Sequence, residues 1–274
     1  MDYADATRAL TAHLRALSKT RIALFGLNPA SVPDKMKLDG FLATQKAHGA
    51  QSPEKDVFYN TGSIGDACRT FLEKAPEYDA AICVNDILAL ALVRRLKDTC
   101  IRIPRDLHLA TFGTSPLSYA QLNGLNVMTA QMDFEEVGRQ AIHVSRLLSD
   151  HPSLSSLSAF LSCKIYTGAE SDAGEPPDPP QGQAFSRLQM PQVDFYGDME
   201  ANNILRMEKF LSECDEIDIS LIRCLMQNMT YGDIAETLFI SEGTVNYRLK
   251  KLFAITHTGS REEFVAFWSQ YQSL

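Results

Sequence analysis

Short apolar runs alternate with stretches of helical spacing between residues 2 and 112, and this alternation constrains the fold more than any other feature. The runs are apolar at successive positions, which is typical of strands buried on both faces of a parallel sheet. Helical stretches between such runs predict βαβ units. The runs are Arg21–Gly26, Asp56–Tyr59, Ala80–Val84 and Leu107–Phe112. We therefore expect an α/β lobe whose parallel sheet is covered by helices on both faces.

Five segments of this region carry a resemblance to a known family. They are Arg21–Gly26, Lys37–Phe41, Asp79–Leu90, Ile103–Gly113 and Val127–Gly138. In order and spacing they resemble the carboxyl-terminal lobe of the LacI-type ligand domain, which is itself similar to periplasmic sugar-binding proteins. The resemblance covers residues 2–170 and implies a lobe of a periplasmic-binding-protein-like fold that senses a small molecule.

The resemblance also implies an effector site at the carboxyl ends of the strands, where open α/β sheets bind ligands. Lys37 stands where the family places an effector-binding arginine, and Asn85 or Asp86 stands where an Asn-Asp pair lines the cleft. Structural alternatives are a solvated helix residue for Lys37 and a helix N-cap for Asn85 with Asp86. Gly113 stands where an aspartate commonly holds sugar hydroxyls, which argues against sugar binding.

In the resembled family another lobe precedes this one, and the ligand lies between the two. Met1 coincides with the start of the second lobe, so we expect an internal start, a truncated product or a fragment of a longer protein. A strand at 126–130, a helix at 134–148 and a strand at 159–167 correspond to parts that cross back into the first lobe. They predict exposed apolar surface, or packing against a partner chain, over residues 126–167.

A proline-rich stretch follows the lobe. Residues 171–183 contain four prolines and two glycines, which is typical of a linker. We divide the chain into an incomplete sensing lobe at 1–170, a linker at 171–195, a connecting helix at 196–214 and an all-α domain at 215–274. The connecting helix is either a dimerising or signalling element or a plain packing helix.

The last domain contains two helical patterns joined by a tight turn. Val245, Leu249 and Leu252 share the apolar face of the second helix, and Ser241 precedes it as an N-cap. Its remaining positions are polar and basic, which is the geometry of a helix that enters a DNA major groove. The predicted DNA-binding residues are Thr244, Val245, Asn246, Tyr247, Arg248, Lys250 and Lys251.

The segment 231–245 resembles the helix-turn-helix of LuxR (GerE-like) regulators, in which Ile-Ala precedes the turn and Ser-x-x-Thr-Val opens the recognition helix. Residues 219–226 look like the first helix of that family, and residues 259–265 look like the start of its fourth, often a dimer contact. Residues 247–249 are instead similar to the PucR group, so the subfamily stays open. The resemblance implies double-stranded DNA as partner and a homodimer.

The composition limits these expectations. From residue 216 onward five Lys and Arg oppose seven Asp and Glu, a net charge of −2, so attraction to phosphates must come from a local patch. No apolar run approaches the ~20 residues of a membrane span, and the start lacks the positive charge of a signal peptide. We expect no membrane partner and a cytoplasmic location.

Chemistry-bearing residues are scattered. The six cysteines and six histidines fall in no metal-ligand spacing, and no paired acid and base or activated nucleophile is visible. We expect no enzyme activity, no metal and no cofactor. Our hypothesis is a transcription regulator whose sensory lobe, with a small-molecule effector or a partner bound to it, modulates the helix-turn-helix. The alternatives are a constitutive DNA binder with a decayed ligand domain, or a small-molecule or protein-interaction module without DNA function, favoured by the net charge of −8.

Overall fold

The structure is a computed structural model that describes residues 1–113, 122, 125–167 and 197–272. The chain divides into two compact units; the described residues up to Glu200 belong to the first, and those from Ala201 belong to the second. The predicted linker and both of its boundaries lie outside the described residues and stay predictions.

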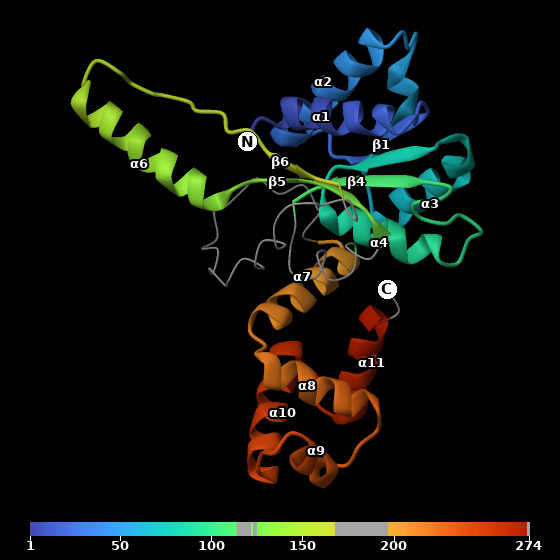
Figure 1. Ribbon diagram of the computed structural model, residues 1–274, viewed down its shortest axis with the longest axis vertical. Helices are drawn as coiled ribbons and strands as arrows, with labels where there is room; N and C mark the ends of the chain where they lie inside the picture. The colour runs from blue at the N-terminus through green and yellow to red at the C-terminus, as the bar shows by residue number, and fades with distance from the viewer. Residues whose placement is uncertain (114–121, 123–124, 168–196, 273–274) are drawn as a thin grey trace. The chain divides into compact units, whose positions relative to one another are not determined.

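The first unit is built on one six-stranded sheet with strand order β2-β1-β3-β4-β5-β6 (Figure 1). The strands are β1 (Ile22–Leu27), β2 (Val57–Tyr59), β3 (Ala80–Cys83), β4 (His108–Phe112), β5 (Met128–Gln131) and β6 (Lys164–Tyr166). β1 to β5 pair in parallel, and every residue of β1 and β3 is buried, as the apolar runs predicted. β6 pairs antiparallel with β5 and covers less than the predicted strand, because its pairing with β5 begins only at Lys164 among the described residues.

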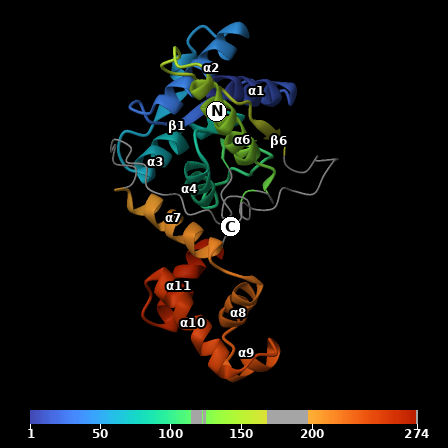
Figure 2. The same ribbon diagram turned by 90° about the vertical axis from the view of Figure 1, so that its left-hand side faces the viewer.

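Helices cover both faces of the sheet, which confirms the predicted fold class (Figure 1, Figure 2). α1 (Tyr3–Ala16) and α2 (Val32–Ala47) lie on one face, and α3 (Ile64–Lys74) and α4 (Asp86–Leu96) lie on the other. Gly40 allows α1 and α2 to approach closely, because a Cβ at this position would lie 2.3 Å from the carbonyl oxygen of Ala4. Short 3₁₀ helices at Pro53–Asp56 and Ala75–Glu77 lie in the connections that lead into β2 and β3.

One helix of this unit differs from the others in its exposure. α6 (Phe134–Asp150) contains no buried residue, and Figure 1 shows it extending away from the sheet. Phe134, Ile142 and Leu147 are exposed, as is every residue from 151 to 160. The prediction of exposed apolar surface is therefore confirmed for α6 and the segment after it, although β5 itself is buried or half-buried.

The described part of the second unit is helical. It contains α7 (Met199–Ser212), which begins in the first unit, α8 (Glu216–Met226), α9 (Tyr231–Thr237), α10 (Glu242–Thr256) and α11 (Arg261–Gln272). Phe210 of α7 packs against Phe264 and Trp268 of α11, with ring centroids 5.8 and 5.9 Å away. Among the described helices of the chain, none is both long and apolar enough to cross a bilayer.

Candidate nucleic-acid interface

The turn between α9 and α10 is fixed by caps and by core side chains. Thr230 and Asp233 form a capping box at the start of α9, and Ser241 accepts a hydrogen bond from the Thr244 amide at 3.1 Å, as predicted. Ile234 and Val245 are fully buried and anchor the two helices to each other. The start of α10 is therefore held in one orientation relative to α9.

The outer face of α10 presents three polar or aromatic side chains to solvent. Asn246, Tyr247 and Lys250 are all exposed, and 73% of the surface of Tyr247 is accessible. These positions are spaced i, i+1 and i+4, so they form one stripe opposite the buried face. The Asn246 amide already donates to the carbonyl oxygen of Glu242 at 3.0 Å, which orients its side chain along the helix.

Val245 was predicted to contact DNA, and that prediction is wrong. Its side chain is fully buried, because it belongs to the same apolar stripe as Leu249 and Leu252. Thr244 is half-buried, and its hydroxyl lies 2.9 Å from the hydroxyl of Ser241, so it takes part in the cap. Phe239 is 95% exposed in the turn beside α10, and the sequence pattern did not distinguish it, because its neighbours Leu238 and Ile240 are also apolar.

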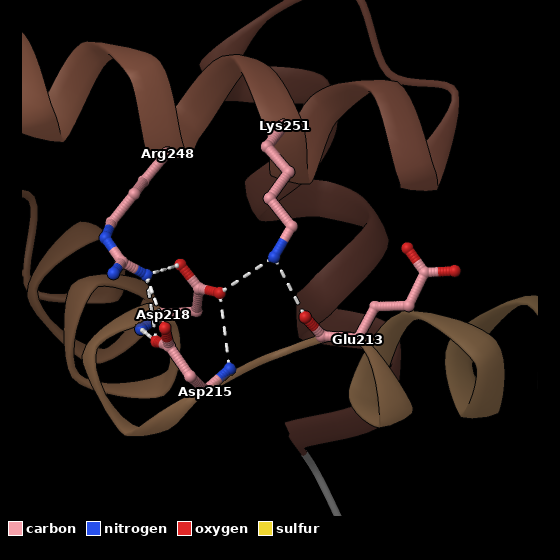
Figure 3. Close-up of polar contacts among 5 residues, drawn as sticks. All are labelled: Glu213, Asp215, Asp218, Arg248 and Lys251. Carbon is pink, nitrogen blue, oxygen red and sulfur yellow. Dashed lines mark hydrogen bonds and ion pairs between the residues drawn. The ribbon is translucent and has the colours of Figure 1, made fainter. Parts of the chain in front are cut away.

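Arg248 and Lys251 are bound to acidic and carbonyl groups at the start of α8 (Figure 3). Arg248 donates to Asp218 at 2.7 Å and to Asp215 at 2.8 Å, and its side chain is only 21% exposed. Lys251 donates to the carbonyl oxygen of Glu213 at 2.9 Å and pairs with Asp218 at 3.4 Å. The structure thus places both cations in a network that joins α10 to α8, and not in the outer stripe where we expected them.

Asp218 is the centre of this network, which we call the α8–α10 ion cluster (Glu213, Asp215, Asp218, Arg248 and Lys251). It has no exposed surface, and its carboxylate also accepts from the Asp215 amide at 3.2 Å. The hydrogen bond from Arg248 is the main cause that lowers the pKa of Asp215. Because the pKa of Asp215 is lower in the folded protein than its unfolded value near 3.8, its carboxylate stabilises the fold at pH values above 3.8. That stabilisation is lost as the pH falls through the pKa of the folded state.

The predicted effector residue Lys37 is buried at the carboxyl edge of the first unit's sheet. Its ammonium group donates to Asp34 at 2.8 Å and to the carbonyl oxygen of Val84 at 2.7 Å. It also lies over the rings of Tyr3 and Phe112, 4.8 and 4.9 Å from their centroids. Burial lowers the pKa of Lys37 despite the opposing attraction of Asp34. The interpretation of Lys37 as a solvated helix residue is therefore wrong. Its ammonium group already has protein partners.

Asn85 and Asp86 lie at the same edge. Asn85 caps α4 by accepting from the Leu88 amide at 2.9 Å, which confirms the capping interpretation. Asp86 is half-buried and close to Gly113, where an added Cβ would lie 4.0 Å from the Asp86 carboxyl carbon. The structure therefore brings the predicted effector residues together. Asp86 lies next to Gly113, the position at which the resembled family commonly has an aspartate. In the part of the chain that the structure describes, no three His, Cys, Asp or Glu side chains could hold a metal.

Comparison with known families matches both units. Residues 11–167 match the model of the periplasmic binding protein-like domain, and residues 215–252 match that of a winged helix-turn-helix DNA-binding domain. The second match ends within α10, and the described residues after it, as far as 272, contain no strand. It therefore concerns the three helices α8, α9 and α10.

This match overturns the LuxR (GerE-like) interpretation of the terminal domain. The residues that suggested it have structural roles: Ile234 and Ala235 are buried before the turn, Ser241 caps α10, and Val245 anchors it. Any helix-turn-helix needs small or apolar residues before the turn and a cap after it. The pattern therefore reported the turn geometry and could not identify the family.

The relatives are transcription regulators. The HTH-type transcriptional regulator MalR of Streptomyces coelicolor is 32% identical over 123 residues, and reg1 of Streptomyces lividans is 32% identical over 124; each match covers 42% of this chain. The chain spans 35% of the length of these relatives. Two solved structures share the fold: a LacI-family regulatory protein from Chloroflexus aggregans (17% identity, TM-score 0.53, 60% of this chain and 59% of that one) and a CelR–cellobiose complex (23%, 0.50, 61% and 51%).

Proposed function

Because this chain belongs to the periplasmic binding protein-like domain family and also carries a helix-turn-helix DNA-binding domain, we propose that it is a transcription regulator of the LacI-like group. In this proposal the sensory lobe modulates how the helix-turn-helix binds double-stranded DNA. The observation that carries it is the exposed stripe of Asn246, Tyr247 and Lys250 on a helix whose other side is anchored in the core. Chromosomal DNA as partner implies a cytoplasmic location.

Each residue of the stripe has a chemistry suited to a duplex. The amide of Asn246 matches the donor and acceptor edge of adenine, and the ammonium group of Lys250 suits guanine or a phosphate. Tyr247 offers an aromatic face and a hydroxyl at the most exposed position of the helix. Thr244, near the amino end of α10, would contact the DNA backbone. Arg248 and Lys251 support this surface from the α8–α10 ion cluster.

The effector in this proposal is a small polar molecule bound at the carboxyl edge of the sheet. Asp86 is the residue that we propose as its ligand, with Asn85 positioning the same turn. One solved neighbour is a regulator in complex with cellobiose, which supports a sugar-like effector by analogy of fold alone. Binding would change DNA affinity only if the effector prefers one of two arrangements of the protein.

We also propose a homodimer. The helix-turn-helix domain carries a net charge of −2 from residue 216 onward, so one copy attracts DNA weakly. Two copies that contact half-sites about one helical turn apart would add their binding free energies. A palindromic operator would follow from that symmetry.

Replacing Asn246 and Lys250 together by alanine is expected to weaken binding to a selected operator duplex about 100-fold. The variant loses one base-reading amide and one cation, each worth roughly 1–3 kcal/mol in such contacts. The matched control is Arg223→Ala with Gln227→Ala, which removes one cation and one amide from exposed positions of α8 and its cap. Fluorescence anisotropy with duplexes selected from genomic fragments measures both. Equal losses in the two variants, or no binding by the unmodified chain, would reject the proposal.

A constitutive DNA binder is the second candidate. It is favoured by the engaged ammonium of Lys37 and by the glycine at position 113, which together leave few free groups for a ligand. One measurement distinguishes the two candidates, namely the midpoint temperature of thermal unfolding of the lobe with and without a panel of mono- and disaccharides. A shift with any sugar supports the regulated form, and no shift with all of them supports the constitutive one.

A further inference from the structure

The first residues of α7 are bound to the lobe by polar groups. Residues 198–200, which we call the α7 anchor, belong to the first unit, whereas α7 from Ala201 onward belongs to the second. Within the anchor Met199 is 79% exposed, and none of the three residues is buried. Because no apolar side chain of the anchor is buried, its attachment to the lobe depends on hydrogen bonds and an ion pair.

Asp198 joins the starts of two helices. One oxygen of its carboxylate accepts a hydrogen bond at 2.8 Å from the amide of Ile64, the first residue of α3. The other oxygen accepts from the Glu200 amide at 2.8 Å, in the first turn of α7. Amides at the start of a helix have no partner within the helix and attract negative charge. A single carboxylate therefore attaches the first turn of α7 to the first turn of α3.

Arg95, near the end of α4, forms the ion pair of the anchor. Its guanidinium group donates to both carboxylate oxygens of Glu200, each at 2.7 Å. It also donates to the carbonyl oxygen of Ala91 at 3.1 Å, which holds it against its own helix. The guanidinium group passes over Gly65 of α3, where an added Cβ would lie 3.3 Å from one of its nitrogens. A forked pair fixes direction as well as distance, so it responds to small displacements of α4.

The helix α4 connects this ion pair to the proposed effector site. Asn85 and Asp86 lie at its start, and Arg95 lies nine residues beyond Asp86, about 14 Å along the helix axis. Every residue from Ile87 to Val93 is buried, so α4 is packed along its length and moves as one body. A displacement of Asp86 therefore also displaces Arg95.

We propose that α4 and the α7 anchor form the path by which an effector acts on the helix-turn-helix unit. Effector binding at the start of α4 shifts the equilibrium between a bound and a released anchor. Because α7 continues into the core of the second unit, where Phe210 packs against Phe264, release of the anchor removes a restraint on that unit. The inference specifies the regulation of the proposed effector site and rests on that part of the proposed function.

Arg95→Met tests the ion pair of the anchor. Methionine removes both hydrogen bonds to Glu200, so the anchor opens more often. We expect the amides of Ile64 and Glu200, which both bond to Asp198, to exchange with deuterium at least about tenfold faster. Amide-resolved hydrogen exchange of the full chain, without DNA or effector, measures this. The amides of β1 should exchange as in the unmodified chain, which separates release of the anchor from a loss of global stability.

Two further variants make this test specific. Arg69→Met removes an arginine whose ion pair with Asp66 lies within α3 and is exposed, and it should change the exchange of the two amides less than about twofold. The double variant with Arg95→Glu and Glu200→Arg forms the pair again with reversed sign. It should return the exchange to within about threefold of that in the unmodified chain.

Asn85→Ala tests the path along α4. It removes the cap at the effector end of this helix, so the exchange of the Ile64 and Glu200 amides should rise about threefold. Ser31→Ala removes the equivalent cap from α2, on the other face of the sheet, and should leave the exchange unchanged. Equal exchange in Arg95→Met and Arg69→Met, or equal exchange in the two cap variants, would overturn the proposal. Since no DNA or effector is present, these outcomes are separate from a failure of DNA binding.

Discussion

Lys37→Met is expected to lower the free energy of unfolding of the lobe by about 3–5 kcal/mol, the usual loss when one partner of a buried ion pair is removed. Methionine keeps the length of the side chain but leaves the Asp34 carboxylate, 10% exposed, without its cation. The carbonyl oxygen of Val84 loses its donor in the same step. The substitution therefore lowers the free energy of unfolding by more than a change of apolar side chain at an equally buried position would.

Lys35→Met provides the matched control, because Lys35 lies on the same helix and is exposed. We expect it to change the free energy of unfolding by less than about 0.5 kcal/mol. Urea unfolding followed by far-UV circular dichroism measures both variants. The single tryptophan, Trp268, belongs to the second unit, so its fluorescence transition should not move in either variant. Equal stability of the two variants would show that the Lys37–Asp34 pair does not stabilise the lobe.

Asp218→Asn is expected to destabilise the helical unit by about 3 kcal/mol or more, since it removes the buried charge that two cations share. The amide keeps the shape of the side chain, but it cannot balance both Arg248 and Lys251. It also weakens the capping box at the start of α8, in which the Asp218 carboxylate accepts from the Asp215 amide. DNA affinity should fall in parallel, because α10 loses its attachment to α8.

The control for Asp218→Asn is Glu216→Gln, which makes the same carboxylate-to-amide change at an exposed position in the first turn of α8. Its effect should stay within about 0.5 kcal/mol. Urea unfolding followed by Trp268 fluorescence reads the helical unit in both variants. If the two variants unfold at the same urea concentration, the α8–α10 ion cluster contributes nothing to stability.

The centre of the sheet could be predicted because its strands are buried on both faces. β1 and β3 read as continuous apolar runs, and burial on two sides is what selects such runs. β6 was harder to place, because it is a short edge strand with an exposed lysine, and the mixed apolar and polar residues at 159–166 do not mark where the pairing begins. Direction and length of an edge strand depend on a neighbour distant in the sequence.

The start and the buried face of the recognition helix could be predicted from the sequence, but its ion pairs could not. The cap at Ser241 and the apolar stripe from Val245 follow from local spacing, and both are present. Arg248 and Lys251, by contrast, bond to groups 30 and 38 residues away, and a paired cation looks the same in a sequence as a free one. The Asp-x-x-Asp pattern at 215–218 was the available signal that carboxylates gather there.

Lys37 shows the same limit in the first unit. Its position on α2 is compatible with an exposed helix residue, and only the packed structure shows the two rings and the carbonyl oxygen around its ammonium group. Burial of a charged side chain depends on which elements converge on it, here α1, α2 and the ends of β3 and β4. A family resemblance placed this residue at the correct edge of the sheet but could not assign its partners.

The central claim is that the outer stripe of α10 lies against DNA. Photo-cross-linking tests it most directly, with p-benzoylphenylalanine placed in one variant at Tyr247, on the outer face of α10. In a second variant it replaces Glu262, an exposed residue of α11. This helix packs on the inner side of α10 through Phe253 and Phe264. We predict that irradiation of the operator complex joins the protein to the duplex from position 247 and not from position 262. Cross-links from position 262 with none from position 247, at equal occupancy of the DNA, would contradict the account.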